Sequence, residues 1–155
     1  IDISKQALIT GGKRCKSVSL AVASIFKLPV SDEYCDLVMN IFAPHSVDEI
    51  SRVLKKSGIW LRVYPLERHL MGLKSVIYDT PYLNDVDRSV PNGFSAVSRD
   101  EIKSRITVGG NDNILNLFRM TPYYYKTGKT DQDKLRNVDS LETEIEFGVD
   151  LLRKN

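Results

Sequence analysis

The chain has 155 residues, of which 42% are hydrophobic and 27% charged, and its formal net charge is +2. This composition is typical of one soluble globular domain, and no apolar run approaches the roughly 20 residues of a membrane-spanning helix. A charge this small neither requires nor excludes nucleic acid. Cys15 and Cys35 lack metal-ligand spacing and are too few for a disulfide framework, so we expect no metal site and a cytoplasmic location. Since no apolar run is long enough to span a membrane, we also expect no membrane partner.

The first part of the chain alternates short strands and helices. Ile1, Asp2 and Ile3 fit the end of a strand, and Ser4 is the predicted cap of a helix that ends near Arg14. The alternating apolar residues of SVSLAVAS predict a strand that ends near Ser24, and the apolar run 37–42 predicts another strand, covered on both faces.

A capping box follows these strands. In SVDE, Ser46 is the predicted helix cap and Glu49 is expected to reach back to it, while KKSG at 55–58 is expected to close the helix. IWLRVYP predicts the next strand, which Pro65 stops. Short turns and helical crossovers between these strands indicate an α/β fold with a parallel sheet and helices on its faces.

The second half of the chain gives weaker signals up to its last strand. Apolar residues from Leu66 to Ile77 share one face of a predicted helix, and a loop rich in Asp, Asn and Pro follows. FSAV is a candidate strand, SRDE at Ser98–Glu101 a second capping box, and RITVGG either strand or loop. Residues 111–120 predict a helix, and the alternation at 145–151 predicts a terminal strand.

Polar residues end several of the predicted strands. In open α/β sheets, ligands bind beyond the carboxyl ends of the strands, where Asp2, Ser24, Asn40 and Pro65 are expected. A carboxylate at the end of the second strand of a nucleotide-binding unit can accept hydrogen bonds from both ribose hydroxyls. Taken singly, Asp2 also fits a turn or capping residue, so the series of four carries this prediction.

Three stretches resemble the second to fifth strands of class I S-adenosylmethionine-dependent methyltransferases: IDIS, VASIFKLPVSDEYCDLVMNIFAP and ISRVLKKSGIWLRVYP. More narrowly, ERHLMGLKSVIYD, LFRMTPYYY and the closing strand are similar to bacterial 23S rRNA (guanine-N1)-methyltransferases. The resemblance implies a Rossmann-like sheet, mostly parallel with an antiparallel C-terminal strand. It also implies methyl transfer from S-adenosyl-L-methionine to a hairpin loop of 23S ribosomal RNA.

The resemblance also assigns residues to the cofactor. It implies that Asp2 binds the ribose, that Ser24 and Ile25 lie beside the adenine, and that Asn40 lies near the methyl donor. Without the resemblance, His69 reads as a surface histidine at a helix N-terminus. No catalytic residue is identified. The cofactor-binding set implied in this way is Asp2, Ile3, Ser24, Ile25, Asn40 and His69.

The stretch MTPYYYKTGK is a candidate RNA contact. Three adjacent tyrosines cannot all face one core, so at least one is expected to be exposed, where its ring can stack on an unpaired base near Lys126 and Lys129. We take Tyr124 and Lys126 as candidate substrate-binding residues. In the alternative, Tyr123 and Tyr125 pack against the sheet and the lysines are only solvated.

The family pattern includes a four-cysteine zinc module and a first strand with a glycine-rich turn, both of which would precede Ile1. We therefore expect residues 1–155 to be a partial methyltransferase domain, from the C-terminal part of a longer protein. A chain of these residues alone is expected to bind the cofactor weakly or not at all, unless a second copy closes the gap in a homodimer or the sheet edges meet directly. The alternative functions are methylation of a small molecule and a non-catalytic binding module that has lost the cofactor.

Overall fold

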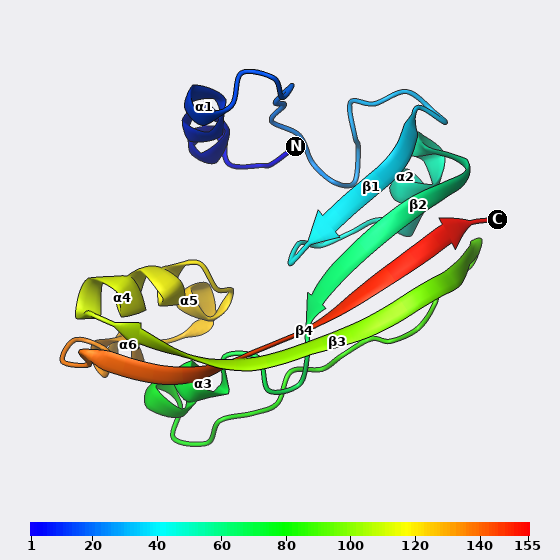
Figure 1. Cartoon of the computed structure of the whole chain (residues 1–155). Coiled ribbons are helices and arrows are strands. Elements are labelled where there is room, and N and C mark those ends of the chain that lie inside the picture. The colour runs from blue at the N-terminus through cyan, green and yellow to red at the C-terminus, as the bar shows by residue number, and fades with distance from the viewer. The chain divides into compact units, whose positions relative to one another are not determined.

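Figure 1 shows the computed structural model, which describes residues 1–155. Its four strands form one sheet in the order β1-β2-β4-β3. No helix has the length and apolar content needed to cross a lipid bilayer. The elements are α1 Lys5–Arg14, β1 Cys35–Ile41, α2 Val47–Val53, β2 Leu54–Pro65, α3 Met71–Ile77, β3 Phe94–Gly109, α4 Asn111–Arg119, α5 Tyr123–Lys126, α6 Lys129–Asp133 and β4 Ser140–Lys154.

The sheet is mixed, and its C-terminal strand is antiparallel to β3. At one end of this pair, the Gly110 N–H donates to the Asp139 carbonyl at 2.8 Å, and at the other end the Asn155 N–H donates to the Gly93 carbonyl at 3.0 Å. As the residue number rises along β3, the number of the hydrogen-bonded residue on β4 falls, which is the antiparallel pattern. The α/β class and the antiparallel C-terminal strand are therefore confirmed.

The chain divides into two units, which we describe separately. The first unit comprises Ile1–Arg62, Ser89–Arg99 and Asp150–Asn155, and the second comprises Val63–Arg88 and Asp100–Val149.

The N-terminal part of the first unit has little regular structure besides α1. Ser4 caps α1 as predicted, because its hydroxyl accepts the Ala7 N–H at 3.2 Å, yet no residue of α1 is buried. The strands predicted at 1–3 and 18–24 are reduced to isolated bridges between Asp2 and Val22 and between Ser24 and Lys27. The sequence pattern therefore overestimated these strands, since only isolated bridges pair these two segments.

The prediction that the apolar strand β1 is covered on both faces is wrong. Leu37, Met39 and Ile41 are 49%, 65% and 52% exposed. Only the other face packs, where Val38 lies against a core cluster that includes Ile50 of α2. An apolar run shows what a strand is able to bury, and β1 is an edge strand of this sheet.

A buried ion cluster braces the first unit. The Asp150 side chain is 1% exposed and binds Arg62 at 2.6 Å and Arg99 at 2.8 Å. Burial raises the pKa of Asp150, but the hydrogen bonds from Arg99 and Arg62 outweigh burial and leave the pKa below its usual value. The carboxylate is therefore held in its charged form.

The helix predicted from Leu66 to Ile77 is shorter than expected. Leu66, Leu70, Leu73 and Ile77 are all buried, but α3 begins only at Met71 because Leu70 adopts a left-handed backbone with φ 57°. Leu70, Leu73 and Ile77 belong to the core of the second unit. That core comprises Leu70, Leu73, Ile77, Ile114, Phe118, Tyr123, Leu135 and Leu141.

Gly72 lets α3 lie directly against β4. A Cβ atom at this position would lie 1.9 Å from the Glu142 carbonyl oxygen, and the Gly72 N–H donates to the Glu144 carboxylate at 3.0 Å. The absence of a side chain is therefore required for this contact.

One charged residue lies inside the second unit. Lys74 is fully buried, and its ammonium donates to the Tyr82 carbonyl at 2.9 Å and to Asn84 Oδ1 at 2.6 Å. The same nitrogen lies 4.4 Å from the centre of the Tyr82 ring and 5.0 Å from that of Tyr123. No carboxylate pairs with it, and burial lowers the pKa of Lys74.

The structure contradicts two predicted helix boundaries. Ser98–Glu101, predicted as a capping box, lies in the middle of the 16-residue strand β3. KKSG at 55–58 does not close α2 but forms the start of β2, since α2 ends at Val53. In both cases pairing with neighbouring strands determines the structure, although a four-residue sequence pattern predicts a helix boundary. The helix predicted at 111–120 and the terminal strand are confirmed as α4 and β4.

Candidate cofactor and substrate residues

The segments that carry Asp2 and Ser24 lie side by side. The Asp2 N–H donates to the Ala21 carbonyl at 3.3 Å, and the Ala23 N–H donates to the Asp2 carbonyl at 3.2 Å, which makes a parallel bridge between Asp2 and Val22. The structure therefore brings together two of the predicted strand ends.

Asp2 makes the capping contact that its position suggested, and its ribose contact stays a prediction. Its Oδ1 accepts the Ser4 N–H at 2.7 Å, which is a capping contact at the start of α1. The residue is exposed, and its second carboxylate oxygen has no protein partner. One oxygen thus fixes the carboxylate, and the other is able to accept a hydroxyl proton. This arrangement fits the ribose end of a nucleoside cofactor.

Ser24 and Ile25 form a tight turn. The Ser24 hydroxyl accepts the Phe26 N–H at 3.2 Å, and the Lys27 N–H donates to the Ser24 carbonyl at 3.1 Å. Ile25 is half-buried, while Phe26 is 69% exposed. The sequence prediction did not include Phe26, an exposed aromatic residue directly after a predicted strand end.

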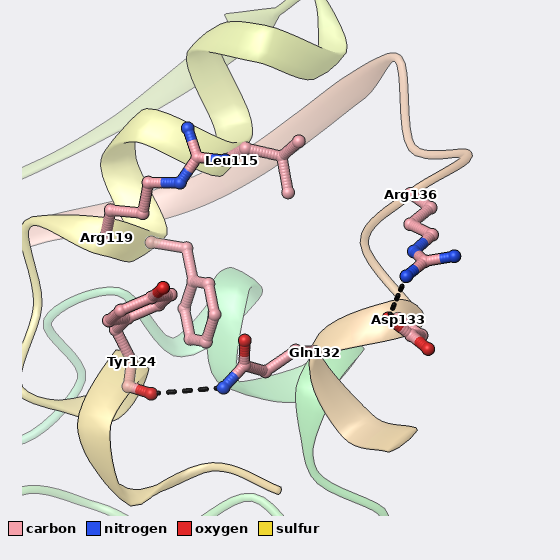
Figure 2. A pocket seen from close by; sticks show the side chains of 7 residues that line it. Leu115, Arg119, Tyr124, Gln132, Asp133 and Arg136 are labelled. Atoms are coloured by element: carbon pink, nitrogen blue, oxygen red, sulfur yellow. Dashed lines mark hydrogen bonds and ion pairs between the residues drawn. The ribbon is translucent and has the colours of Figure 1, made fainter. Parts of the chain in front are cut away.

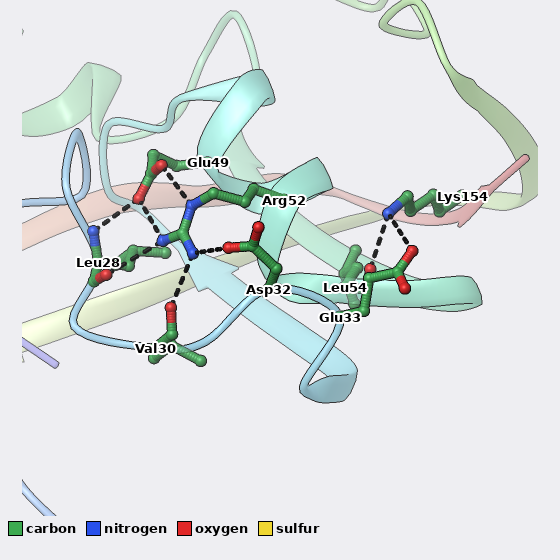
Figure 3. A network of polar contacts seen from close by, with 8 residues as sticks. All are labelled: Leu28, Val30, Asp32, Glu33, Glu49, Arg52, Leu54 and Lys154. Carbon is green, nitrogen blue, oxygen red and sulfur yellow. Dashed lines mark hydrogen bonds and ion pairs between the residues drawn. The ribbon is translucent and has the colours of Figure 1, made fainter.

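Arg52 anchors the segment that follows this turn (Figure 3). Its guanidinium donates to the Leu28 carbonyl at 3.1 Å, to the Val30 carbonyl at 2.8 Å and to Asp32 Oδ1 at 2.6 Å. The same group binds the Glu49 carboxylate at 2.8 Å and 2.9 Å. One side chain of α2 therefore fixes the path of the chain just beyond Ser24 and Ile25.

Half of the predicted capping box at SVDE is present. The Ser46 hydroxyl accepts the Glu49 N–H at 3.4 Å, as expected of a cap. The Glu49 carboxylate, however, does not return to Ser46 but accepts the Leu28 N–H at 2.7 Å and pairs with Arg52. These hydrogen bonds, with that of Arg52 the strongest, lower the pKa of Glu49 to about 2.

Asn40 ends β1 with its side chain turned to the local backbone. It is 7% exposed, and its Nδ2 donates to the Pro44 carbonyl at 3.1 Å. The amide thus braces the turn that leads to α2. Its predicted place near the methyl donor stays a prediction.

His69 belongs to the second unit and is half-buried, so it is not the solvent-facing histidine of the alternative reading. Its Nδ1 accepts the Glu146 N–H at 3.2 Å, which places the proton of a neutral ring on Nε2. Burial lowers the pKa of His69 from its ordinary value, which favours the neutral ring.

The three tyrosines differ in exposure, as their adjacency predicts. Tyr123 is 9% exposed and donates to Asn84 Oδ1 at 3.0 Å, Tyr124 is half-buried, and Tyr125 is 84% exposed. The expectation of at least one exposed ring is confirmed. The ring that protrudes most is Tyr125, next to the predicted contact residues Tyr124 and Lys126.

Comparison with known proteins finds similar methyltransferases. Residues 1–61 match the model of the methyltransferase domain. The Bacillus subtilis protein YxjB, whose name assigns it to the 23S rRNA (guanine-N(1)-)-methyltransferases, is 30% identical over 155 residues, which cover 96% of this chain and 54% of the relative. The chain is therefore similar to methyltransferases over nearly its whole length. It spans about half the length of that relative.

Two further similarities support this assignment. A Streptomyces fradiae protein named 23S rRNA (guanine(748)-N(1))-methyltransferase is 35% identical over 74 residues, which cover 47% of this chain and 26% of the relative. A solved structure from Bacillus halodurans, described as a methyltransferase, has a TM-score of 0.55 at 14% identity and covers 99% of this chain and 80% of that one. The second similarity shows the class I methyltransferase fold alone.

Proposed function

We propose that this methyltransferase transfers a methyl group from S-adenosyl-L-methionine to N1 of a guanine in 23S ribosomal RNA. The observation that carries the proposal is the match to YxjB, which extends over 96% of the chain. The adjacency of Asp2 and Ser24 supports it, because it provides hydrogen-bonding groups for a nucleoside where the class I fold binds its cofactor.

The chain's own residues give this proposal its binding chemistry. S-adenosyl-L-methionine supplies an electrophilic methyl group on a positively charged sulfur. We assign the ribose to Asp2 with Ile3, and the adenine to the surface formed by Ser24, Ile25 and the exposed Phe26. These residues combine one charged acceptor with apolar area, which is the usual composition of a nucleoside site.

We also assign Asn40 of the first unit to the cofactor site, whereas His69 of the second unit is a candidate cofactor contact through the family resemblance alone. Burial favours the neutral form of His69, which avoids a second positive charge near a cationic sulfur. Asn40 holds the turn after β1 through the Pro44 carbonyl and so fixes the end of that strand. Positioning of donor and acceptor is the main contribution expected of the protein.

The reaction requires that guanine N1 lose its proton, so a group that accepts a proton is needed. Among the acids of the loop 79–87, Asp79 is poorly suited, because it pairs with Lys134 at 2.8 Å and the contact lowers the pKa of Asp79. Asn40 is an amide and is no useful base. The group that accepts the guanine N1 proton is therefore neither Asp79 nor Asn40, and we look for it among other groups of the protein and of the RNA.

We place the target base in a hairpin loop of the RNA, since a loop base is already partly unstacked and a chain of net charge +2 suffices to bind it. With this substrate the protein acts in the cytoplasm. Sedimentation of the purified protein distinguishes a monomer from the alternative homodimer.

The deciding experiment measures transfer of a labelled methyl group from S-adenosyl-L-methionine to 23S ribosomal RNA by the whole protein. Methylation at guanine N1 blocks the Watson–Crick edge, so reverse transcription is expected to stop at the modified base. Asp2→Ala is expected to lower kcat/KM for the cofactor about tenfold, whereas Asp48→Ala, which removes another exposed acid of the first unit, is expected to leave it unchanged.

Two results would contradict the proposal. Methyl transfer to small amines or phenols without transfer to RNA would favour the small-molecule methyltransferase. Absence of cofactor binding by the whole protein would favour the non-catalytic binding module.

A further inference from the structure

Helices α4, α5 and α6 of the second unit enclose a pocket of about 190 Å³ (Figure 2). Pockets for drug-sized ligands occupy roughly 300–1,000 Å³, so this one has room for a single flat ring system. Leu115 and Phe118 of α4 give it an apolar side, and Tyr124 of α5 contributes an aromatic ring. The pocket therefore favours a planar and partly apolar group.

Gln132 places a fixed acceptor in this pocket. Its Nε2 donates to the Tyr124 carbonyl at 3.2 Å and to the Thr127 carbonyl at 2.8 Å, so both amide protons are used. The amide cannot rotate without losing these bonds. Its Oε1 has no protein partner and points into the pocket in Figure 2. A ligand with an N–H group would satisfy this oxygen, and every nucleobase pairing edge carries one.

Two arginines stand at the pocket and differ in their partners. Arg136 is paired with Asp133 at 2.9 Å. Arg119 is exposed and donates only to the neutral Asn116 Oδ1 at 3.1 Å, so no carboxylate compensates its charge. An uncompensated guanidinium beside a flat pocket is suited to a phosphate group.

Aromatic rings continue from the pocket to the surface. Tyr124 makes edge contacts with Phe118 at 5.5 Å and with Tyr125 at 5.2 Å, measured between ring centres. Tyr125 is 84% exposed, and Lys126 and Lys129 follow it without an acidic partner. Exposed aromatic rings that alternate with cations are typical of surfaces that bind single-stranded nucleic acid.

We propose that the pocket between α4, α5 and α6 binds the base of one unpaired RNA nucleotide, with Gln132 Oε1 accepting an N–H of the base and Arg119 contacting its phosphate. Tyr125 then stacks on a neighbouring base. This inference rests on the proposed RNA substrate and adds a second point of contact on that RNA. An acidic peptide is disfavoured, because it would use the arginine but neither the apolar side of the pocket nor the exposed Tyr125 ring.

The test measures binding of a fluorescently labelled 12-nucleotide single-stranded RNA to the whole protein by anisotropy, without the methyl donor. The same sequence as a duplex and a poly-glutamate peptide serve as competitors. We expect the unlabelled single strand to displace the labelled one more strongly than the duplex or the poly-glutamate peptide does. Leu115→Trp, which fills the pocket, and Arg119→Gln are each expected to weaken single-strand binding about tenfold.

Arg153→Gln is the matched control, because Arg153 is an exposed arginine of β4 without an acidic partner. It is expected to change the affinity less than twofold. Arg119→Gln should also reduce the slope of log K against log salt concentration by about 0.7, as loss of one phosphate contact does. Thermal melting of each variant shows whether it is folded. Because Arg119 is exposed, Arg119→Gln is expected to stay folded and still tests the proposal if Leu115→Trp unfolds.

The outcomes separate this inference from the proposed function. If RNA binding and methyl transfer are unchanged in both pocket variants, the pocket is not an RNA site and the proposed function stands. If the unaltered protein neither binds nor methylates RNA, both proposals fail. Equal competition by poly-glutamate and RNA would make the site an acidic-peptide site.

Discussion

Residues 1–34 and the second unit are held in different ways. No residue from Ile1 to Tyr34 is buried, and this region is fixed mainly by isolated bridges and by hydrogen bonds from Arg52. The second unit has a core of eight buried residues drawn from four helices and the strand β4 or the segments beside them. The comparison teaches that most proposed cofactor contacts lie where the chain contributes little to folding free energy. Substitutions there are expected to affect binding more than stability.

The largest effect is expected in the second unit. Leu73 is fully buried, so Leu73→Ala should lower the free energy of unfolding by about 2–5 kcal/mol, through lost burial and the cavity left behind. Ile3→Ala, at an 81% exposed position, should change it by less than about 0.5 kcal/mol. Urea titration of both variants measures the difference. Equal losses would show that residues 1–34 are part of the same packed core.

Asp2→Ala should show the opposite behaviour. We expect cofactor affinity to fall about tenfold, since a carboxylate that accepts ribose hydroxyls is lost. The melting temperature should stay close to that of the unaltered protein, because Asp2 is exposed. Calorimetric titration and thermal melting are compared on the same samples. A large fall in melting temperature with unchanged affinity would make Asp2 a capping residue only.

Lys74→Met tests the charge inside the second unit. The pKa of Lys74 is lowered in the folded chain, so between that value and 10.5 the unfolded chain binds more protons and the stability of the unaltered protein rises with pH. The variant lacks this increase. Tyr123, with a pKa raised to about 12, stays neutral in this range. We expect the stability difference to move in favour of the unaltered protein as the pH rises toward 10.5, and a constant difference would contradict the lowered pKa.

The smallest effect is expected for Glu49→Gln in the first unit. The pKa of Glu49 is about 2 when folded and 4.5 ordinarily, so its contribution is complete above pH 4.5 and is lost as pH falls toward 2. The variant should lose less stability than the unaltered protein on acidification from pH 5 to pH 3. Thermal melting across this range gives the comparison, and parallel curves would show that the contact between Arg52 and Glu49 has no effect on folding.

The sequence predicted those parts of the fold that depend on local patterns. Ser4 and Ser46 were recognisable as caps, because capping involves atoms within three residues. The alternation at 145–151 predicted the strand β4 but not its burial, because Ile145, Val149 and Leu151 are half-buried whereas Gly148 and Asp150 between them are buried. The burial of the apolar residues between Leu66 and Ile77 was also predictable. The left-handed backbone at Leu70, because of which α3 begins only at Met71, was not.

Features that depend on distant partners were not predictable. The strand β3 is charged and exposed along most of its length, so neither alternation nor apolar content marks Ser98–Glu101 as a strand. Asp150 is buried with arginines 51 and 88 positions away in the sequence. Buried Lys74 and the orientation of Gln132 likewise depend on tertiary contacts that no local pattern encodes.

The exposed side chains of β1 affect how the protein behaves when it is made in quantity. Leu37, Met39 and Ile41 line an outermost strand that carries no charged residue except Asp36. Such a strand is a template for pairing with other chains, and natural proteins usually protect it with lysine, proline or a bulge. Expression at high concentration is therefore expected to produce insoluble aggregates, and replacing Met39 with lysine is expected to keep more of the protein in the supernatant.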